Sequence, residues 1–432
     1  MSLIQTLANV QGPSDSPFLI SDGHPLTIGE VLSQSSSHLD DVQPGDVVAL
    51  IGDFDQQSIA DLLRLIDRRA VVVPLNASTR NDHDYFFDAA QVDWVIESRS
   101  ATKRSHDLKS SLLDELRLRD CPGLVLFSTG TTGRPKAILH DMTAFLKRFE
   151  TPRPTLRTLA FLMFDHIGGL NTLFHTMFNR GLVVTTPDRA VPSVLGTCKQ
   201  YDVEVLPVTP TFLRMMLMSG LVPDAFPESV KIVTYGTELM DQPTLDALCR
   251  VLPGVDFRQT FGMSELGILR VKSKARNSLY MRIGGEGVQT RVDSGNLHIY
   301  SPTRMMGYLN ADSPFDEAGW FNTNDIVETD GDFIRVVGRT SDVINVGGLK
   351  FMASEVERVV LGYPGVQFVT VNAKSNPVTG QHVEITIEPV SGSQLDLAAM
   401  QDYLRANLPS HMVPRRIEEA EVSVGHRFKR KR

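Results

Sequence analysis

The sequence has few cysteines and lacks long apolar runs. Its three cysteines, Cys121, Cys198 and Cys249, lie far apart among 432 residues and form no CxxC pair. This spacing argues against a disulfide framework or a structural metal site and favours a reducing compartment. No apolar stretch approaches the roughly 20 residues of a membrane-spanning helix, and residues 1–17 do not read as a secretory signal. We therefore expect a cytoplasmic protein without membrane insertion.

An excess of positive charge is also lacking. The chain has 43 Lys and Arg against 51 Asp and Glu, a formal net charge of −8, so the body is not expected to bind nucleic acid. Hydrophobic residues make up 42% and charged residues 22%, as in ordinary globular proteins. The length predicts roughly two or three domains.

Short β-rich runs alternate with amphipathic helical runs between about residues 45 and 260. The strands DVVALIG (46–52) and AVVVPL (70–75), for example, flank the helical run DQQSIADLLRLIDR (55–68). Alternation of this kind predicts parallel sheets covered by helices on both faces. In such folds ligands bind where the carboxyl ends of strands meet the amino termini of helices.

The pattern changes twice in the second half of the chain. After about residue 280, short β segments punctuated by turns predict a small barrel or distorted sheet. From about residue 342, β and helical runs predict a compact α+β unit. Ser354 and Glu357 have the spacing of a capping box, and a later helix is expected to bury one face, formed by Leu397, Met400 and Leu404.

The stretch LVLFSTGTTGRPKAILHD (124–141) carries the strongest local signal. A buried strand is followed by small and hydroxylated residues and then by Lys136. A Walker A loop needs lysine directly after glycine and Ser or Thr directly after lysine, but Pro135 precedes Lys136 and Ala137 follows it. A loop of this composition can still wrap a polyphosphate with backbone N–H groups and hydroxyls; an ordinary Gly/Thr-rich turn is the alternative.

Four further motifs follow this loop in a fixed order. The five motifs are STGTTGRPK (128–136), FGMSE (261–265), GWFNTND (319–325), GRTSDVINVGGLKFMASEVE (338–357) and FKRKR (428–432). The set resembles that of the AMP-forming adenylating enzymes, which include acyl- and aryl-CoA synthetases, stand-alone adenylation domains and luciferases. The resemblance implies an α/β fold with a large N-terminal domain (1–339) of layered parallel sheets and a β-barrel-like subdomain. A small mobile α+β domain (340–432) would follow.

The resemblance implies a reaction in two halves. A carboxylate attacks the α-phosphate of ATP, which gives an acyl-adenylate and pyrophosphate, and a thiol then displaces AMP to form a thioester. The implied cofactors are ATP, Mg²⁺ and coenzyme A; the phosphopantetheine of an acyl carrier protein is the alternative acceptor. The implied partner is a small-molecule carboxylic acid.

Residues that match the motifs are expected to share the family's roles. Glu265 would ligate Mg²⁺ together with phosphate oxygens, and Asp325 would accept hydrogen bonds from the ribose hydroxyls. Asn324 stands where the family usually has glycine and tolerates left-handed backbone. The residues implied in ATP binding are Ser128, Thr129, Gly130, Thr131, Thr132, Gly133, Lys136, Gly236, Thr237, Glu238, Phe261, Gly262, Met263, Ser264, Asp325 and Arg339.

The small domain would supply the catalytic lysine, Lys429, which bridges the carboxylate and the α-phosphate. The alternative for this basic tail is a solvated or weakly nucleic-acid-binding segment, and Phe428 departs from the family's glycine. Rotation of this domain between the half-reactions is implied, with Ser341 as hinge and Gly347 and Gly348 beside the thiol tunnel.

The acid is expected to bind at the segment MFDHIGGLNTLFH (163–175), which resembles the segment that lies near the substrate carboxylate in acyl- and aryl-CoA synthetases. His166 would lie near its carboxylate, although a structural histidine is the alternative. Ile167 occupies the position at which amino-acid-activating relatives hold an amine, so a fatty or aryl acid is favoured. The expected pocket residues are His166, Ile167, Gly169, Thr172, Gly262, Met263 and Gly267.

Three alternatives to a CoA ligase stay open at the level of sequence. The first is a stand-alone enzyme that loads a carrier protein. The second is a non-catalytic nucleotide-binding relative, which loss of Glu265, Asp325 or Lys429 would support; all three are present. The third, a nucleic-acid binder acting through the basic tail, is disfavoured by the net charge.

Overall fold

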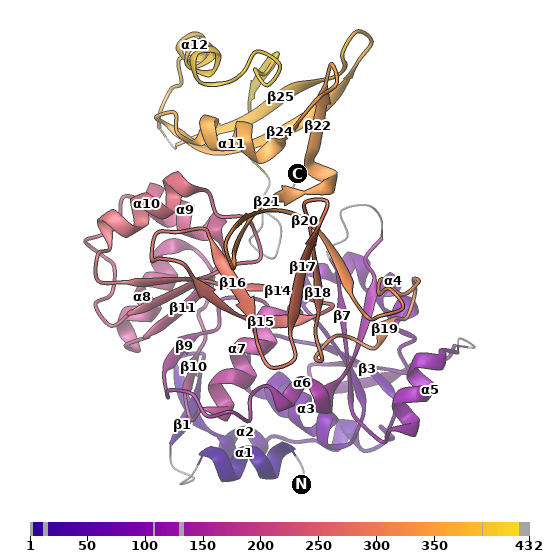
Figure 1. Cartoon of the computed structure of the whole chain (residues 1–432). Coiled ribbons are helices and arrows are strands. Elements are labelled where there is room, and N and C mark those ends of the chain that lie inside the picture. Colours follow the sequence, from indigo (N-terminus) through magenta and orange to yellow (C-terminus); the bar gives the residue numbers. More distant parts are fainter. Residues whose placement is uncertain (1–2, 12–15, 107–108, 129–133, 391, 423–432) are drawn as a thin grey trace.

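The computed structural model describes residues 3–11, 16–106, 109–128, 134–390 and 392–422. The strands of these residues form three seven-stranded sheets and one five-stranded sheet (Figure 1). The predicted α/β class with antiparallel additions is confirmed. Thr129–Gly133, Phe428 and Lys429, which the sequence predicts to act in the site, lie outside the described residues.

The first sheet is parallel except at one edge, where β2 pairs with β1 in antiparallel fashion. Its order is β13 (Asp256–Gln259), β12 (Ile232–Tyr235), β11 (Val205–Val208), β9 (Arg157–Leu159), β10 (Leu182–Val184), β1 (Pro17–Ser21) and β2 (His24–Thr27). The parallel strands end side by side, so the loops after β12 and β13 meet at one edge.

The second sheet has a parallel centre and antiparallel edges. Its order is β19 (Gly307–Tyr308), β8 (Ala137–Asp141), β7 (Gly123–Phe127), β4 (Val71–Leu75), β3 (Val47–Ile51), β5 (Trp94–Glu97) and β6 (Ser100–Lys103). Strand β3 is buried along its whole length. Val48 and Leu50 belong to one hydrophobic cluster and Val47, Ala49 and Ile51 to another, as expected for a strand covered on both faces.

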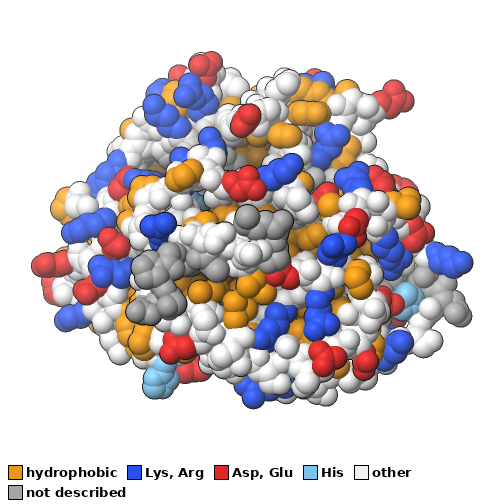
Figure 2. Space-filling view, turned by 90° about the horizontal axis from the view of Figure 1, so that it is seen from below, with side chains coloured by type: hydrophobic (Ala, Val, Ile, Leu, Met, Phe, Trp, Pro, Cys, Tyr) orange, Lys and Arg blue, Asp and Glu red, His pale blue; other side chains and the backbone are white. Residues whose placement is uncertain are grey.

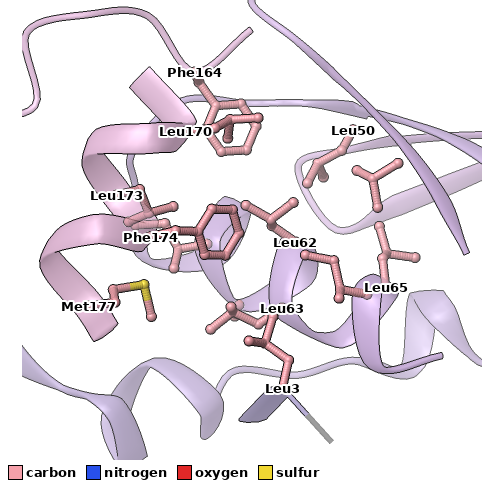
Figure 3. Close-up of a cluster of buried hydrophobic side chains, with 14 of the residues drawn as sticks. Leu3, Leu50, Leu62, Leu63, Leu65, Phe164, Leu170, Leu173, Phe174 and Met177 are labelled. Atoms are coloured by element: carbon pink, nitrogen blue, oxygen red, sulfur yellow. The ribbon is translucent and has the colours of Figure 1, made fainter. Parts of the chain in front are cut away.

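Helices separate and cover these two sheets. The helices α1 (Leu3–Gln11), α3 (Gln56–Asp67) and α7 (Ile167–Phe178) lie between them, and Figure 3 shows Leu62 of α3 next to Phe174 of α7. The first sheet packs its outer face on α8 (Val191–Gln200), α9 (Pro210–Met218) and α10 (Gln242–Val251). The outer face of the second sheet packs on α4 (His83–Ala90) and α5 (Ser111–Leu118).

Shorter elements complete this body. They are α2 (Ile28–Leu32), α6 (Met142–Lys147) and the 3₁₀ turns η1 (Ser37–Leu39) and η2 (Ala77–Asp82). Many helices begin at a side-chain cap: Asp55 accepts from the Ser58 N–H and Thr209 from the Phe212 N–H. A cap satisfies a backbone donor that has no partner within the helix, so these polar residues fix where α3 and α9 begin.

The third sheet is antiparallel, as the turn-rich sequence after residue 280 predicts. Its order is β14 (Phe261–Met263), β15 (Gly267–Ser273), β16 (Met281–Gly284), β21 (Phe333–Arg339), β20 (Phe321–Asp330), β18 (Asn296–Tyr300) and β17 (Gln289–Asp293). It has its own hydrophobic core, which includes Leu266, Leu297 and Phe321. Strands β20 and β21 carry Asp325 and Arg339 opposite each other.

The fourth sheet follows the turn η3 (Thr340–Asp342). It contains β23 (Leu349–Met352), β22 (Val343–Val346), β25 (Gly380–Pro389), β24 (Val366–Asn376) and β26 (Arg416–Glu419), with α11 (Ala353–Leu361) and α12 (Leu397–Asn407). Its core, which includes Val356, Met400 and Leu404, is separate from the others. This sheet lies at the top of Figure 1.

Two predictions for this region are wrong in detail. The capping carboxylate of α11 is Glu355, which accepts from the Met352 N–H at 2.9 Å, and not Glu357. Ser354 lies inside the helix and donates its hydroxyl to the carbonyl of Val337 on β21, so this side chain does not cap α11. Leu397, expected on the buried face of α12, is 37% exposed because it is the first residue of the helix.

The fourth sheet is held against the body by a buried arginine of α9. Arg214 is 7% exposed, and its guanidinium donates to the carbonyl of Val366 and to the hydroxyl of Thr244 on α10, each at 2.8 Å.

Among the described helices, none is both long and apolar enough to cross a membrane. Figure 2 shows basic and acidic side chains interspersed over the face seen from below.

Candidate active site

The base of the predicted phosphate loop is a closed turn between two antiparallel strands. The Ser128 N–H donates to the carbonyl of Lys136 at 3.1 Å, and the Lys136 N–H donates to the Ser128 hydroxyl at 3.1 Å. Strands β7 and β8, buried and paired from Phe127 and Ala137 onward, fix these two ends. The loop therefore leaves and re-enters the sheet at one point, with Lys136 at its exit.

Lys136 and Glu265, 129 positions apart in the chain, are joined by one aromatic side chain. The Lys136 Nζ lies 4.7 Å from the centroid of the Tyr308 ring, and the Tyr308 hydroxyl donates to Glu265 Oε1 at 2.8 Å. Burial and the adjacent carboxylate both raise the pKa of Tyr308, so the phenol stays protonated and remains a donor. This places a cation and a half-buried carboxylate around one ring.

Tyr308 and three other residues of this region were not predicted from the sequence. His140 on β8 donates from Nε2 to the carbonyl of Ser264 at 2.6 Å; full burial lowers the pKa of His140 to about 4, so the ring is neutral near pH 7. Asn310 accepts from the Ala137 N–H, and Tyr85 donates to the carbonyl of Pro135 at 2.7 Å. These contacts anchor the loop and the FGMSE segment to one another.

A polar residue in a buried strand is the one signal that could have drawn attention to His140. Its neighbours Ile138 and Leu139 are fully buried, and a buried imidazole needs a partner. Tyr308 gives no comparable signal, because its partners Lys136 and Glu265 are distant in sequence. The pairing of β19 with β8, with Tyr308 opposite Ile138, brings them together.

Asp325 and Arg339 form a second polar group on the third sheet. Asp325 is 5% exposed, and its Oδ1 lies 3.2 Å from the Arg339 Nε. Burial raises the pKa of Asp325 to about 6, against the opposing effect of Arg339. The preceding residue, Asn324, has φ 57°, as expected where asparagine stands in the place of a glycine.

The loops after β12 and β13 meet as the parallel sheet predicts. Gly236 packs so closely on Thr260 that a Cβ at position 236 would lie 2.2 Å from the threonine Oγ1. Thr237 has φ 71°, a conformation that threonine rarely adopts; such outliers cluster at functional sites. The carboxylate of Glu238 accepts from the hydroxyl and N–H of Thr211, so it also fixes the start of α9.

The expected acid segment begins at a helix terminus. His166 is the buried N-cap of α7, and its Nδ1 accepts from the Gly168 N–H at 3.0 Å. Gly169 lies against the backbone, since a Cβ there would lie 2.0 Å from the carbonyl oxygen of Met163. Thr172 donates its hydroxyl to the carbonyl of Gly168. Packing thus explains Gly169 without any contact to a substrate.

The FGMSE segment turns sharply next to this helix. Phe261–Met263 pairs in antiparallel fashion with the start of β15, and Gly267 has φ 78°. A Cβ at Gly262 would lie 2.7 Å from the carbonyl oxygen of Gly267. The two glycines, both predicted to line the acid pocket, therefore lie against each other.

The predicted hinge residue lies within η3, and the predicted thiol-tunnel residues lie shortly after it in the chain. Ser341 is part of η3, where its hydroxyl donates to the Asp342 carboxylate. Gly347 and Gly348 form the turn between β22 and β23 with φ 61° and 88°. A Cβ at either glycine would meet open space, so it is the backbone conformation that requires glycine there.

Within the described ranges, no group of three or more His, Cys, Asp or Glu side chains is placed to hold a metal ion. A Mg²⁺ ion needs few protein ligands when phosphate oxygens and water complete its octahedron. Glu265, half-buried and next to the loop base through Tyr308, fits such a single-carboxylate role.

Comparison with known proteins identifies the family. Residues 7–309 match the model of the AMP-binding enzyme family. The chain is 24% identical over 336 residues to a 4-coumarate–CoA ligase-like protein of Oryza sativa subsp. japonica, an alignment that covers 69% of this chain and 56% of that protein. It is 26% identical to the 2-succinylbenzoate–CoA ligase of Bacillus subtilis (strain 168), with 77% and 72% covered.

The fold agrees with that of a solved relative along the whole chain. The crystal structure of the anthranilate CoA ligase AuaEII in complex with anthranoyl-AMP superposes with a TM-score of 0.82 at 17% identity, covering 100% of this chain and 95% of that one. The architecture and the site residues define an adenylate-forming enzyme fold. The chain belongs to the AMP-binding enzyme family, and the resemblance noted from the sequence is confirmed.

Proposed function

We propose that this protein is an AMP-forming acid–thiol ligase. In the first half-reaction a carboxylate oxygen attacks the α-phosphorus of ATP; the bond to the bridging oxygen breaks and pyrophosphate leaves. In the second, the sulfur of coenzyme A attacks the acyl carbon, loses its proton, and AMP leaves with the electrons of the broken acyl–oxygen bond. The CoA ligases among its relatives support this class.

The observation that carries the proposal is the link from Lys136 through Tyr308 to Glu265. The first half-reaction brings two anions together, so charge must be neutralised before attack. Lys136 provides positive charge at the exit of the phosphate loop. Glu265, in turn, provides the carboxylate for Mg²⁺, which when bound shields the phosphate charge. Ser128 and the loop residues up to Gly133 would surround the β- and γ-phosphates.

The nucleoside part of ATP is assigned to the third sheet and to the loops after β12 and β13. Asp325 accepts the ribose hydroxyls, and Arg339, already within 3.2 Å of it, holds the carboxylate in place. The adenine lies against a wall formed by the close contact of Gly236 with Thr260 and by the strained Thr237. Glu238 positions this wall through Thr211, and the segment 261–264 continues it.

Residues 340–432 act as the small catalytic domain, and residues 1–339 as the domain that binds ATP and the acid. Lys429 contacts the carboxylate and the α-phosphate during adenylation. Rotation about Ser341 then exchanges it for the turn at Gly347 and Gly348, beside which the thiol enters. The separate hydrophobic core of the fourth sheet supports such an independent movement.

The acid is assigned to the space between the start of α7 and the Gly262–Gly267 turn. His166 lies at its reactive end, and Ile167, Thr172 and Met263 line it. Gly169, Gly262 and Gly267 contribute by close backbone packing. No amine-binding carboxylate occupies position 167, so the acid is not an α-amino acid; coenzyme A is the proposed acceptor, with carrier-bound phosphopantetheine as the alternative.

ATP–pyrophosphate exchange tests the first half-reaction directly. Purified protein with MgATP and labelled pyrophosphate is assayed with fatty, aryl and amino acids, one at a time. We expect exchange with fatty or aryl acids, none without an acid, and none when EDTA removes Mg²⁺. Absence of exchange with every acid, in protein that binds ATP, would contradict the proposal and favour a non-catalytic relative.

The acceptor is tested in a second assay with the best acid of the panel. Coenzyme A and a pantetheinylated carrier protein are supplied separately, and the thioester is detected by mass spectrometry. Thioester formation with coenzyme A supports the CoA ligase, whereas formation on the carrier alone would replace it by the carrier-loading reaction.

A further inference from the structure

One arginine near the Gly267 turn, half-buried as a residue but with all three guanidinium nitrogens buried, has no role in the site described so far. Arg148 follows the last residue of α6, and its guanidinium lies against Gly267. A Cβ at Gly267 would lie 2.3 Å from the arginine Nη1 and 2.4 Å from Nη2. The guanidinium also stacks on the Phe145 ring, with its carbon 4.7 Å from the ring centroid. Glycine at 267 is therefore what makes room for this cation.

The guanidinium has no polar partner within the described part of the chain. Its three nitrogens, Nε, Nη1 and Nη2, are buried and make no hydrogen bond to any described residue. Burial lowers the pKa of Arg148 to about 10, which still leaves it charged near pH 7. The charge of Arg148 acts on His140, which is neutral and donates to the carbonyl of Ser264.

The ring on which Arg148 stacks belongs to an aromatic cluster. Phe145 is 1% exposed and contacts Phe149 and Phe174, with ring centroids 5.6 and 6.3 Å away. Phe174 belongs to α7, the helix that carries His166 at its N-terminus. A planar cation with five donors in a fixed fork thus lies against the Phe145 ring and the Gly267 turn, and the Phe145 ring in turn contacts α7.

A buried guanidinium without a partner is unfavourable, and the group that offsets this is an anion with two acceptor oxygens in one plane. Carboxylates match the guanidinium fork with two parallel hydrogen bonds. A neutral alkyl or unsubstituted aryl tail would instead leave the charge buried and unpaired after binding. Arg148 would therefore favour acids whose end remote from the reacting carboxylate bears a second carboxylate over acids with a neutral tail.

We propose that Arg148 binds a second carboxylate of the substrate, so that the acid activated here is a dicarboxylic acid. One carboxylate reacts at the His166 end, while the other pairs with Arg148 beside Gly267. This inference rests on the proposed acid activation and narrows its substrate class. Arg148 acts in specificity, since it contacts the far end of the acid and not the reacting atoms.

The test compares matched acids and matched variants in ATP–pyrophosphate exchange. Straight-chain dicarboxylates of four to ten carbons are each paired with the monocarboxylate of equal length, and benzoate is paired with isophthalate and terephthalate. For at least one pair we expect the wild-type kcat/KM to favour the diacid by about tenfold to a hundredfold, the range of a charge-assisted hydrogen bond. Arg148→Met should abolish that preference by raising KM for the diacid.

Two controls separate recognition from folding. Lys147→Met removes the same charge from an exposed neighbour on α6 and should leave the preference unchanged. Arg148→Lys keeps the charge without the fork and should retain part of the preference. Equal ratios of diacid to monoacid activity in wild type and in Arg148→Met would overturn the inference while leaving acid activation intact.

Melting temperatures keep the inference testable if no acid supports exchange. With ATP present, a dicarboxylate should raise the melting temperature of the wild type but not that of Arg148→Met. That result supports the second-carboxylate site even though the proposed reaction has failed. Equal shifts in both proteins, or none in either, would overturn the inference.

Discussion

Two carboxylates of the site are held in different ways. Asp325 is 5% exposed and is paired by the protein with the guanidinium of Arg339, 3.2 Å away. Glu265 is half-buried and accepts from a neutral phenol, Tyr308, at 2.8 Å, while the nearby lysine lies over the ring of that phenol.

The difference suits the two carboxylates to their proposed roles, Asp325 to neutral hydroxyls and Glu265 to a cation. Asp325 has its countercharge in the chain, so it can accept hydrogen bonds from a neutral diol without needing a further cation. Glu265 is oriented by a neutral donor, which leaves its charge for a metal ion. The predictions that follow change one member of this comparison at a time.

Replacing Glu265, the carboxylate proposed to bind Mg²⁺, should reduce the rate of adenylation more than any other change considered below. Glu265→Gln keeps the size of the side chain and an acceptor for Tyr308 but loses the negative charge. We expect adenylation to fall about 10²-fold or more, with little change in melting temperature. The rate is measured by pyrophosphate exchange over a range of Mg²⁺ concentrations; a wild-type rate at saturating Mg²⁺ would contradict the metal role.

Replacing the paired carboxylate should weaken ATP binding and change the pH dependence of stability. Asp325→Asn removes a charged acceptor, so KM for ATP should rise about tenfold to a hundredfold. The folded-state pKa of Asp325, about 6, lies above the ordinary 3.8. Its contribution to stability is therefore complete below pH 3.8 and is lost as the pH rises through 6.

Asp325→Asn, which does not ionise, should thus be more stable than the wild type at pH 8, by up to about 3 kcal/mol. The difference should shrink to near zero at pH 4. Urea unfolding at pH 4, 6 and 8 measures the free energy of unfolding of both proteins. A variant less stable than the wild type at pH 8 would show that the ion pair with Arg339 outweighs the cost of burying the carboxylate, and would contradict the raised pKa of Asp325.

Removing only the hydroxyl that orients Glu265 should have the smallest effect. Tyr308→Phe keeps the ring under Lys136 but loses the hydrogen bond to the carboxylate, and loss of such an orienting group weakens metal binding or activity by about tenfold. Tyr308→Leu also removes the ring and should reduce the rate further. Pyrophosphate exchange at low and saturating Mg²⁺ distinguishes the two variants; identical losses would mean that the hydroxyl carries the whole effect and that the ring under Lys136 adds nothing.

The sequence predicted the fold class and most element positions because periodicity and turn residues are local signals. The left-handed Asn324 follows from the motif in which it stands. The capping pair of α11 was misplaced, because the local spacing of Ser354 and Glu357 does not show that the Ser354 hydroxyl binds the Val337 carbonyl on another sheet.

The site was predictable where a motif carries it and not where partners come from distant strands. Glu265, Asp325 and Lys136 belong to motifs, and their assigned roles stay predictions. Tyr308, His140 and Arg148 belong to none of the five. Their importance follows from tertiary contacts: the pairing of β19 with β8, the carbonyl of Ser264, and the backbone of Gly267.

The central claim is that Glu265 serves the first half-reaction. Single-turnover formation of the acyl-adenylate, followed by mass spectrometry after rapid quenching, tests it most directly in wild type, Glu265→Gln and the exposed control Glu286→Gln. The account predicts adenylate at equal rates in wild type and Glu286→Gln, and at least about 10²-fold more slowly in Glu265→Gln. Equal rates in all three proteins would contradict it.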